Sequence, residues 1–240
     1  MRALVIEHDS MTLAGPVGDR LVHHGFEVVE LLVVPPERHR TPNVDVAFPE
    51  PSEWDLIVPM GAPWSVDDQA SIGTWIGDEL ALLRKAHDTG VPVLGICFGG
   101  QALATALGGG VERAPRPEIG WVGIETDEPS LVGPGPWFQY HFDRWVPPPG
   151  AVEIARNDVA PQAFRIGRSL GVQFHPELTA AELELWLAGG GERDMRRLGL
   201  DPAAVLDRTR ALAPAAERRA HAFVDAFLRH ARLLPPSGLG

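Results

Sequence analysis

A single cysteine, Cys97, is present in this chain of 240 residues, so an internal disulfide bond is excluded. Small secreted domains commonly need such bonds, whereas a chain of this length can bury enough surface to fold without them. The sequence also lacks a long apolar run near its start, where only Ala3 to Ile6 are apolar before charge returns. A signal peptide or a membrane span needs a longer run. We therefore expect a soluble, cytoplasmic protein that does not associate with membranes.

Positive charge is also scarce. Lys and Arg total 21 residues and Asp and Glu total 32, which gives a formal net charge of −11. Because an acidic protein repels phosphate backbones and anionic lipid, nucleic acid is not an expected partner. The chain has neither a second cysteine nor a His-x-x-x-His pair, so it lacks the ligand spacing typical of a metal site. We expect no metal and no cofactor.

Short apolar runs alternate with segments of helical periodicity in the first half of the chain. Strands are predicted at 2–7, 27–34, 56–59 and 91–96, and helices at 15–24, 74–87 and 101–107. This alternation predicts an α/β fold of three layers, in which a mostly parallel open sheet has helices on both faces. The segment from 118 to 175 contains short strands separated by Pro and Gly, which indicates antiparallel strands added to that sheet.

The last quarter of the chain has a helical pattern. Thr179 to Glu182 matches a capping box and opens a short helix, and a glycine-rich break is predicted at 188–194. Asp201-Pro202 is typical of a helix start, and a second helical pattern covers 215–233. We predict one domain over 1–188 and a helical C-terminal extension over 189–240 that packs on it.

The segment Gly95 to Gln101, GICFGGQ, contains the lone cysteine. A predicted strand ends at Ile96 and a helix begins near Gly99, so the chain must turn sharply at Cys97. This is the strand-turn-helix arrangement of a nucleophile elbow, with Cys in place of Ser. A thiol there lies at the carboxyl edge of the sheet, where open α/β folds bind ligands, and at a helix N-terminus, which favours the thiolate. The alternative is a small buried hydrophobic side chain.

A cysteine nucleophile needs a base, and the best candidate among nine histidines is His175 in GVQFHPE. Pro176 restricts His175 to an extended conformation, so His175 and Glu177 point the same way. The Glu177 carboxylate can then accept the second imidazole N–H and fix the tautomer. His8 follows the first strand and could reach the same edge of the sheet, although loop polarity explains it equally well. Most of the others are interpreted as solvated or capping side chains: His23, His24, His39, His87, His221 and His230.

Two long motifs, GICFGGQALA and GVQFHPE, lie in this order and resemble the class I glutamine amidotransferases. Standalone members similar to the glutaminase domain of GMP synthetase look closest in pattern. PMGAPWSVDD at 59–68, EIGW at 118–121 and QYHFD at 139–143 also resemble family segments. The resemblance covers 1–188 and implies a flavodoxin-like fold. It further implies that Cys97 attacks the γ-carboxamide of glutamine, that His175 passes the thiol proton to ammonia, and that Glu177 orients His175.

The resemblance also implies an oxyanion hole. The backbone N–H of Phe98 and one N–H from the Gly61-Ala62 turn would hold the developing charge, a contribution of about 2.7–4 kcal/mol per donor. This sequence has Ala62 where the family usually has a second glycine. Ala62 therefore has to avoid a conformation that only glycine adopts.

The substrate pocket implied by the resemblance includes Gln101, which would contact the amino-acid end of glutamine. The backbone of Tyr140 and His141 would complete it. No synthetase segment is recognised in the chain, so a separate synthetase or acceptor protein is the implied destination of the ammonia.

Two other functions remain open from the sequence. A γ-glutamyl hydrolase or peptidase would use the same triad and oxyanion hole on another γ-glutamyl amide, because the first chemical step is identical. A binding or regulatory module could keep the fold without the chemistry. All three triad positions are filled, which disfavours the module.

Overall fold

The four strands predicted in the first half lie side by side in one half of a single sheet in the computed structural model, which describes residues 1–235. The sheet order is β2-β1-β3-β4-β10-β9-β8-β6, with a parallel bridge from Ile57 to Val93 joining β3 to β4. The strands are β2 (Glu27–Leu32), β1 (Arg2–Glu7), β3 (Leu56–Pro59), β4 (Leu94–Ile96), β10 (Ser169–Val172), β9 (Pro161–Ile166), β8 (Val152–Arg156) and β6 (Glu125–Thr126). The first five are parallel, and β9, β8 and β6 continue the sheet in antiparallel fashion.

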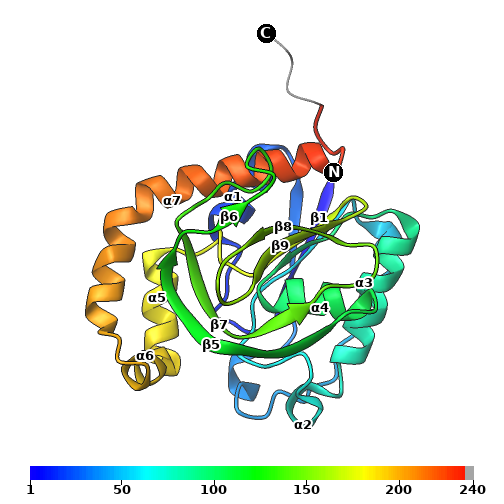
Figure 1. Ribbon diagram of the computed structural model, residues 1–240. Helices are drawn as coiled ribbons and strands as arrows, with labels where there is room; N and C mark the ends of the chain where they lie inside the picture. Colours follow the sequence, from blue (N-terminus) through cyan, green and yellow to red (C-terminus); the bar gives the residue numbers. More distant parts are fainter. Residues whose placement is uncertain (236–240) are drawn as a thin grey trace.

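Helices cover both faces of this sheet, as Figure 1 shows. Alternate residues of β1 point to opposite faces, because side chains alternate along a strand. Ala3 and Val5 belong to the core under α1 (Gly15–His23) and α7 (Pro202–His230). Leu4 and Ile6 belong to the core under α3 (Ile76–Thr89) and α4 (Phe98–Ala106). The predicted three-layer arrangement is therefore present.

Two long strands form a separate antiparallel ribbon beside the sheet, β5 (Gly110–Val122) and β7 (Trp137–Val146). A bridge between Phe138 and His175 attaches the ribbon to the segment that follows β10. His175 N–H donates to the Phe138 carbonyl over 2.9 Å. The ribbon thus lies against the end of β10, close to the predicted catalytic residues.

The C-terminal part differs from the prediction in two ways. The expected glycine-rich break is a π-helical turn at Leu187–Gly191 that connects α5 (Ala180–Trp186) to α6 (Glu192–Arg197). The pattern expected at 215–233 is the second half of the continuous helix α7, which contains Pro214. Proline removes one N–H and leaves only the Arg210 carbonyl without its helical partner, and Arg210 is exposed to water. The helix therefore continues through the proline.

Helix α7 is part of the main core. Phe223, Val224 and Phe227 pack in the cluster that contains the β1 residues. Asp225 pairs with Arg20 of α1 through two hydrogen bonds of 2.7 Å each. The division at residue 188 remains a prediction, and α7 packs directly on the first part of the chain.

The remaining elements are short. They are α2 (Gln69–Ile72) and two 3₁₀ turns at Pro36–Arg38 and Pro51–Glu53. Across residues 1–235, every helix is too short or too polar to cross a membrane.

Candidate active site

Cys97 occupies a sharp turn between β4 and α4. Its backbone φ is 51° and ψ is −106°, a strained conformation for a residue with a side chain. Two glycines permit this turn. A Cβ at Gly95 would lie 2.5 Å from the Gly99 carbonyl oxygen, and one at Gly99 would lie 2.0 Å from the Pro59 carbonyl oxygen. The predicted elbow geometry is therefore present, with the helix beginning at Phe98 rather than Gln101.

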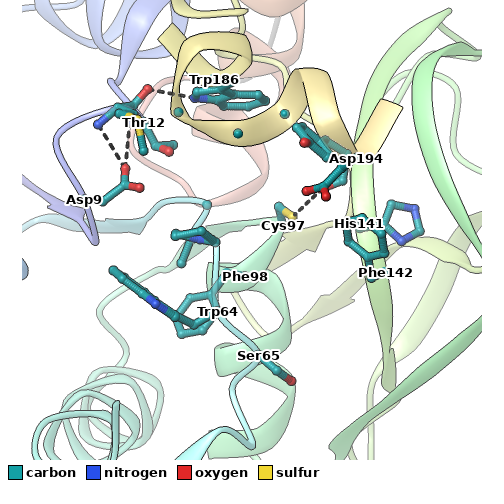
Figure 2. A pocket seen from close by; sticks show the side chains of 18 of the residues that line it. Asp9, Thr12, Trp64, Ser65, Cys97, Phe98, His141, Phe142, Trp186 and Asp194 are labelled. Atoms are coloured by element: carbon teal, nitrogen blue, oxygen red, sulfur yellow. Dashed lines mark hydrogen bonds between the residues drawn. The ribbon is translucent and has the colours of Figure 1, made fainter. Parts of the chain in front are cut away.

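The Cys97 thiol faces a cavity of about 400 Å³ at the carboxyl edge of the parallel strands. Figure 2 shows Cys97 between Trp186 on one side of the view and Trp64 on the other. The Cys97 side chain is 5% exposed. Its Sγ lies 3.6 Å from Gln173 Nε2 and 3.9 Å from the Tyr140 carbonyl oxygen.

His175 lines the same cavity and is bound to Glu177. Nδ1 donates to Glu177 Oε1 over 2.7 Å, while Nε2 is buried and makes no hydrogen bond within residues 1–235. Burial lowers the pKa of His175, but the interactions of His175 with Cys97 and Glu177 outweigh this effect and hold the pKa well above its ordinary value. Nε2 is thus the ring nitrogen available for a thiol proton.

A second buried carboxyl group, that of Glu182, lies close enough to Glu177 to interact with its charge. Glu182 is 2% exposed, and its Oε1 accepts from the Leu13 N–H over 2.9 Å. Burial and the charge of Glu177 raise the pKa of Glu182 well above its ordinary value. The capping box is half confirmed, because Thr179 accepts from the Glu182 N–H but the Glu182 side chain bonds to Leu13. The capping-box motif did not predict the contact between Glu182 and Leu13.

Among the backbone N–H groups at the cavity wall, two that matter for the predicted oxyanion hole have no acceptor among residues 1–235. One is the N–H of Phe98 at the first position of α4, and the other is the N–H of Ala62. Ala62 and Phe98 both line the cavity. Gly61 packs against His175, since a Cβ on residue 61 would lie 3.1 Å from His175 Cε1. Ala62 does not have positive φ, so the missing family glycine causes no strain.

The structure also brings Gln101 and Tyr140 to the cavity. The Gln101 amide, 4% exposed, donates to the Asp143 carbonyl over 3.2 Å and to Gln173 Oε1 over 3.3 Å. Its side chain is therefore held by the protein at the cavity wall. Substrate contact by these residues remains a prediction.

His141 also lines the cavity, but its ring is engaged elsewhere. Nε2 contacts Glu118 Oε2 at 3.0 Å, and Nδ1 contacts the Asp143 carbonyl at 3.0 Å. Burial raises the pKa of Glu118, but hydrogen bonds from His141 and Asn157 outweigh it and the pKa is lowered. This buried network joins β5 to β7. The EIGW glutamate thus anchors the ribbon that carries Tyr140.

Several cavity residues were not predicted from the sequence. Trp186, Arg193 and Asp194 come from the C-terminal segment, and Asp9 follows β1. The Trp186 ring lies 5.0 Å from the His175 ring at an angle of 71°, and its Nε1–H donates to the Met11 carbonyl over 2.7 Å. No motif or periodicity marks these residues.

Within 1–235, His, Cys, Asp and Glu side chains form no cluster of three or more that could hold a metal ion.

Comparisons with known proteins identify a related family. A sequence profile described as "Glutamine amidotransferase class-I" matches residues 19–185. A GMP synthase (glutamine-hydrolyzing) of Thermus thermophilus is 42% identical over 102 residues, which are 39% of this chain and 20% of that protein. The chain therefore matches about a fifth of the length of this curated relative.

Two solved structures have the same fold over nearly the whole chain. A glutamine amidotransferase from Thermotoga maritima superposes with a TM-score of 0.80 at 22% identity, covering 96% of this chain and 98% of that one. A glutamine amidotransferase from Methylobacillus flagellatus gives 0.77 at 27% identity, covering 99% and 96%. These likenesses confirm the predicted α/β fold class.

Proposed function

Because this chain belongs to the class I glutamine amidotransferase family, whose members hydrolyse the amide of glutamine, we propose that it releases ammonia from L-glutamine through a thioester on Cys97. The observation that carries the proposal is the cavity that joins a strained cysteine to a histidine oriented by a carboxylate. A nucleophile, a base and a group that orients the base are the three parts that covalent acyl transfer requires.

The first half of the reaction forms the thioester. Cys97 Sγ attacks the side-chain carbonyl carbon of glutamine, and the thiol proton is held on His175 Nε2. The Glu177 carboxylate stabilises the imidazolium through the bond to Nδ1. The carbonyl oxygen becomes an oxyanion, which the N–H groups of Phe98 and Ala62 receive. The carbon–nitrogen bond then breaks, and His175 passes its proton to the departing ammonia.

The second half restores the enzyme. Water attacks the thioester, and His175 takes one of its protons. The carbon–sulfur bond breaks, and the Cys97 thiolate and glutamate are left. The net change is that glutamine and water become glutamate and ammonia.

The test is ammonia and glutamate release from L-glutamine by the purified chain, with Cys97→Ala beside it. Cysteine-dependent release is the expected result. No release from folded protein whose Cys97 reacts with iodoacetamide contradicts glutamine as the substrate of the chain alone. An unreactive Cys97 in folded protein favours the non-catalytic module instead.

One observation supports a second candidate, a γ-glutamyl hydrolase. The cavity continues beyond Cys97 to the charged residues Asp9, Arg113, Arg193 and Asp194, and its volume of about 400 Å³ is in the range of pockets for ligands larger than a free amino acid. A γ-glutamyl amide with a larger leaving group would use the same thioester step. Comparing kcat/KM for glutamine and for γ-glutamyl dipeptides separates the two functions.

The proposed fate of the ammonia is transfer to an acceptor bound by a separate synthetase protein. The relative from Thermus thermophilus is a glutamine-hydrolysing GMP synthase, and this chain matches only 20% of it. Faster glutamine hydrolysis on addition of a partner would support this, and a rate that is already maximal alone would favour plain hydrolysis.

A further inference from the structure

His8 follows β1 and is completely buried, yet no step of the proposed mechanism uses it. Its ring lies between two aromatic side chains. The ring centroids of His8 and Phe98 are 4.6 Å apart in an edge contact, and those of His8 and Trp75 are 5.8 Å apart in a stacked arrangement. A buried ionisable side chain in such apolar surroundings requires partners for its polar atoms.

Both nitrogens of His8 have partners that accept hydrogen bonds. Nδ1 lies 3.1 Å from the Gly61 carbonyl oxygen, which only accepts, so Nδ1 carries a proton. Nε2 lies 3.0 and 3.1 Å from the two oxygens of Glu79. These nearly equal distances place Nε2 between the two oxygens of Glu79. This is the arrangement expected of an imidazolium paired with a carboxylate.

The charged groups around the ring are consistent with this state. Burial lowers the pKa of His8, but Glu79 of α3, the Gly61 carbonyl and Asp9 outweigh it and the pKa is raised. Trp75 and Phe98, which pack on the ring from the other sides, carry no charge. An imidazolium has no second tautomer, so Nδ1 always remains a donor to Gly61.

The Gly61 carbonyl belongs to the same planar peptide as the Ala62 N–H, and in a trans peptide the two groups point in opposite directions. Holding the carbonyl back against buried His8 therefore directs the Ala62 N–H away from His8. Ala62 lines the cavity, and its N–H has no acceptor within residues 1–235. The second oxyanion donor, Phe98, packs on the same His8 ring.

We propose that His8, held by Glu79, is a positioning residue that fixes the Gly61-Ala62 peptide so that the Ala62 N–H receives the oxyanion formed on the substrate. This inference rests on the proposed function, because it assigns a role within the same reaction. His8 does not touch the substrate. His8 acts through the Gly61-Ala62 peptide group. Loss of its bond to Gly61 should therefore lower kcat more than it raises KM.

A matched pair of substitutions tests which bond of His8 matters. The side-chain nitrogen of Asn lies near the place of Nδ1, and that of Gln lies near the place of Nε2. His8→Asn keeps a donor to Gly61, whereas His8→Gln keeps one toward residue 79. Both are made in the Glu79→Gln background, so that no unpaired charge remains buried.

We expect the His8→Asn/Glu79→Gln variant to keep the kcat of Glu79→Gln within about fivefold, and the His8→Gln/Glu79→Gln variant to lose roughly 10- to 100-fold, because loss of an oxyanion donor costs about 10²–10³. KM and the rate of Cys97 alkylation by iodoacetamide should be equal in both, since alkylation forms no oxyanion. Equal kcat values, or the reverse order, overturn the proposal.

NMR on the wild-type chain covers the case in which these variants do not fold. With labelled histidine and glycine, the His8 Nδ1–H should show coupling across its hydrogen bond to the Gly61 carbonyl carbon, and both ring nitrogens should carry protons at pH 7.5. An unprotonated Nδ1 overturns the inference.

Failure of the proposed function gives a different result. A wild-type chain that does not hydrolyse glutamine, but has a reactive Cys97, refutes glutamine as substrate. The His8 pair is then compared on γ-glutamyl p-nitroanilide, which forms the same oxyanion. Cysteine-dependent release of nitroaniline that follows the Asn-over-Gln order supports the positioning role, and release independent of the substitution overturns it.

Discussion

His175 Nδ1 lies 2.7 Å from Glu177 Oε1, and one proline separates the two residues in the chain. Proline favours an extended conformation for His175, and residues two apart in an extended chain point the same way. The pair is thus built by local sequence alone. It needs the fold only to bring Cys97 to the free Nε2 side of the ring.

Glu177→Gln should lower kcat for glutamine by about 10²- to 10⁴-fold, because loss of the equivalent orienting carboxylate in a serine-protease triad costs about 10⁴. The substitution also removes one of the charges that raise the pKa of His175. The imidazolium then loses its proton at lower pH, so the alkaline limb of the kcat profile should move to lower pH. Glu184→Gln, an exposed change on α5, is the control. Unchanged kcat and limb position would show that Glu177 does not orient the histidine.

The residues that could be predicted from sequence are those that local geometry controls. The elbow at Cys97 follows from glycines that must permit close approach, and the β1 pattern follows from burial on two faces. The parallel strands lie within a few residues of their predicted positions. The sequence shows these features through local residue patterns, even where the close approach itself, as of Gly99 to Pro59, is to a distant part of the chain.

Long-range contacts were not predictable in the same way. Trp186 reaches His175 only because α5 turns back over the cavity, and the Glu182 contact to Leu13 joins residues far apart in the chain. His8 was visible as a residue at the edge of the sheet, but its partners Glu79 and Gly61 come from two later elements. A sequence pattern records the type of each residue and carries no sign of such pairings.

Trp186→Ala should lower kcat by about 2- to 10-fold, because an aromatic pair is worth about 0.5–1.5 kcal/mol beyond its burial. The substitution removes the ring that packs on His175 and also opens the cavity wall, so KM should rise. Trp186→Phe keeps an aromatic edge there and should stay closer to wild type. Steady-state kinetics of the two variants measure this, with Trp54→Phe, outside the cavity, as control. Equal kcat for Trp186→Ala and wild type contradicts the contact's role.

Gly99→Ala should prevent folding or lower the free energy of unfolding by more than about 4 kcal/mol. Its Cβ would lie 2.0 Å from the Pro59 carbonyl oxygen, which is backbone and cannot rotate away. Gly77→Ala in α3 is the matched control, because a Cβ there meets nothing within 4 Å. Alanine favours helix, so that variant should gain up to about 1 kcal/mol. Urea denaturation compares them, and similar stability for both alanine variants would contradict the close approach at the elbow.

Glu7 at the end of β1 should make stability depend on pH. It is 6% exposed, and Oε1 has no hydrogen-bond partner within residues 1–235. Burial, with the charges of Glu30 and Asp9, raises its pKa to about 7 from an ordinary value of 4.5. Between those two values the folded state binds a proton that the unfolded state has lost. The stabilisation from Glu7 is therefore complete below pH 4.5 and disappears as pH rises through 7.

Glu7→Gln removes this titration while keeping the size of the side chain. The free energy of unfolding of the variant relative to wild type should increase by up to about 3 kcal/mol between pH 4.5 and pH 8, since one pKa unit corresponds to about 1.4 kcal/mol. Urea denaturation at pH 4.5, 6 and 8 measures the difference. Glu217→Gln, exposed on α7, should show no such trend. Parallel pH curves for wild type and Glu7→Gln would mean that Glu7 titrates alike in the folded and unfolded chain, and its burial would then carry no electrostatic cost.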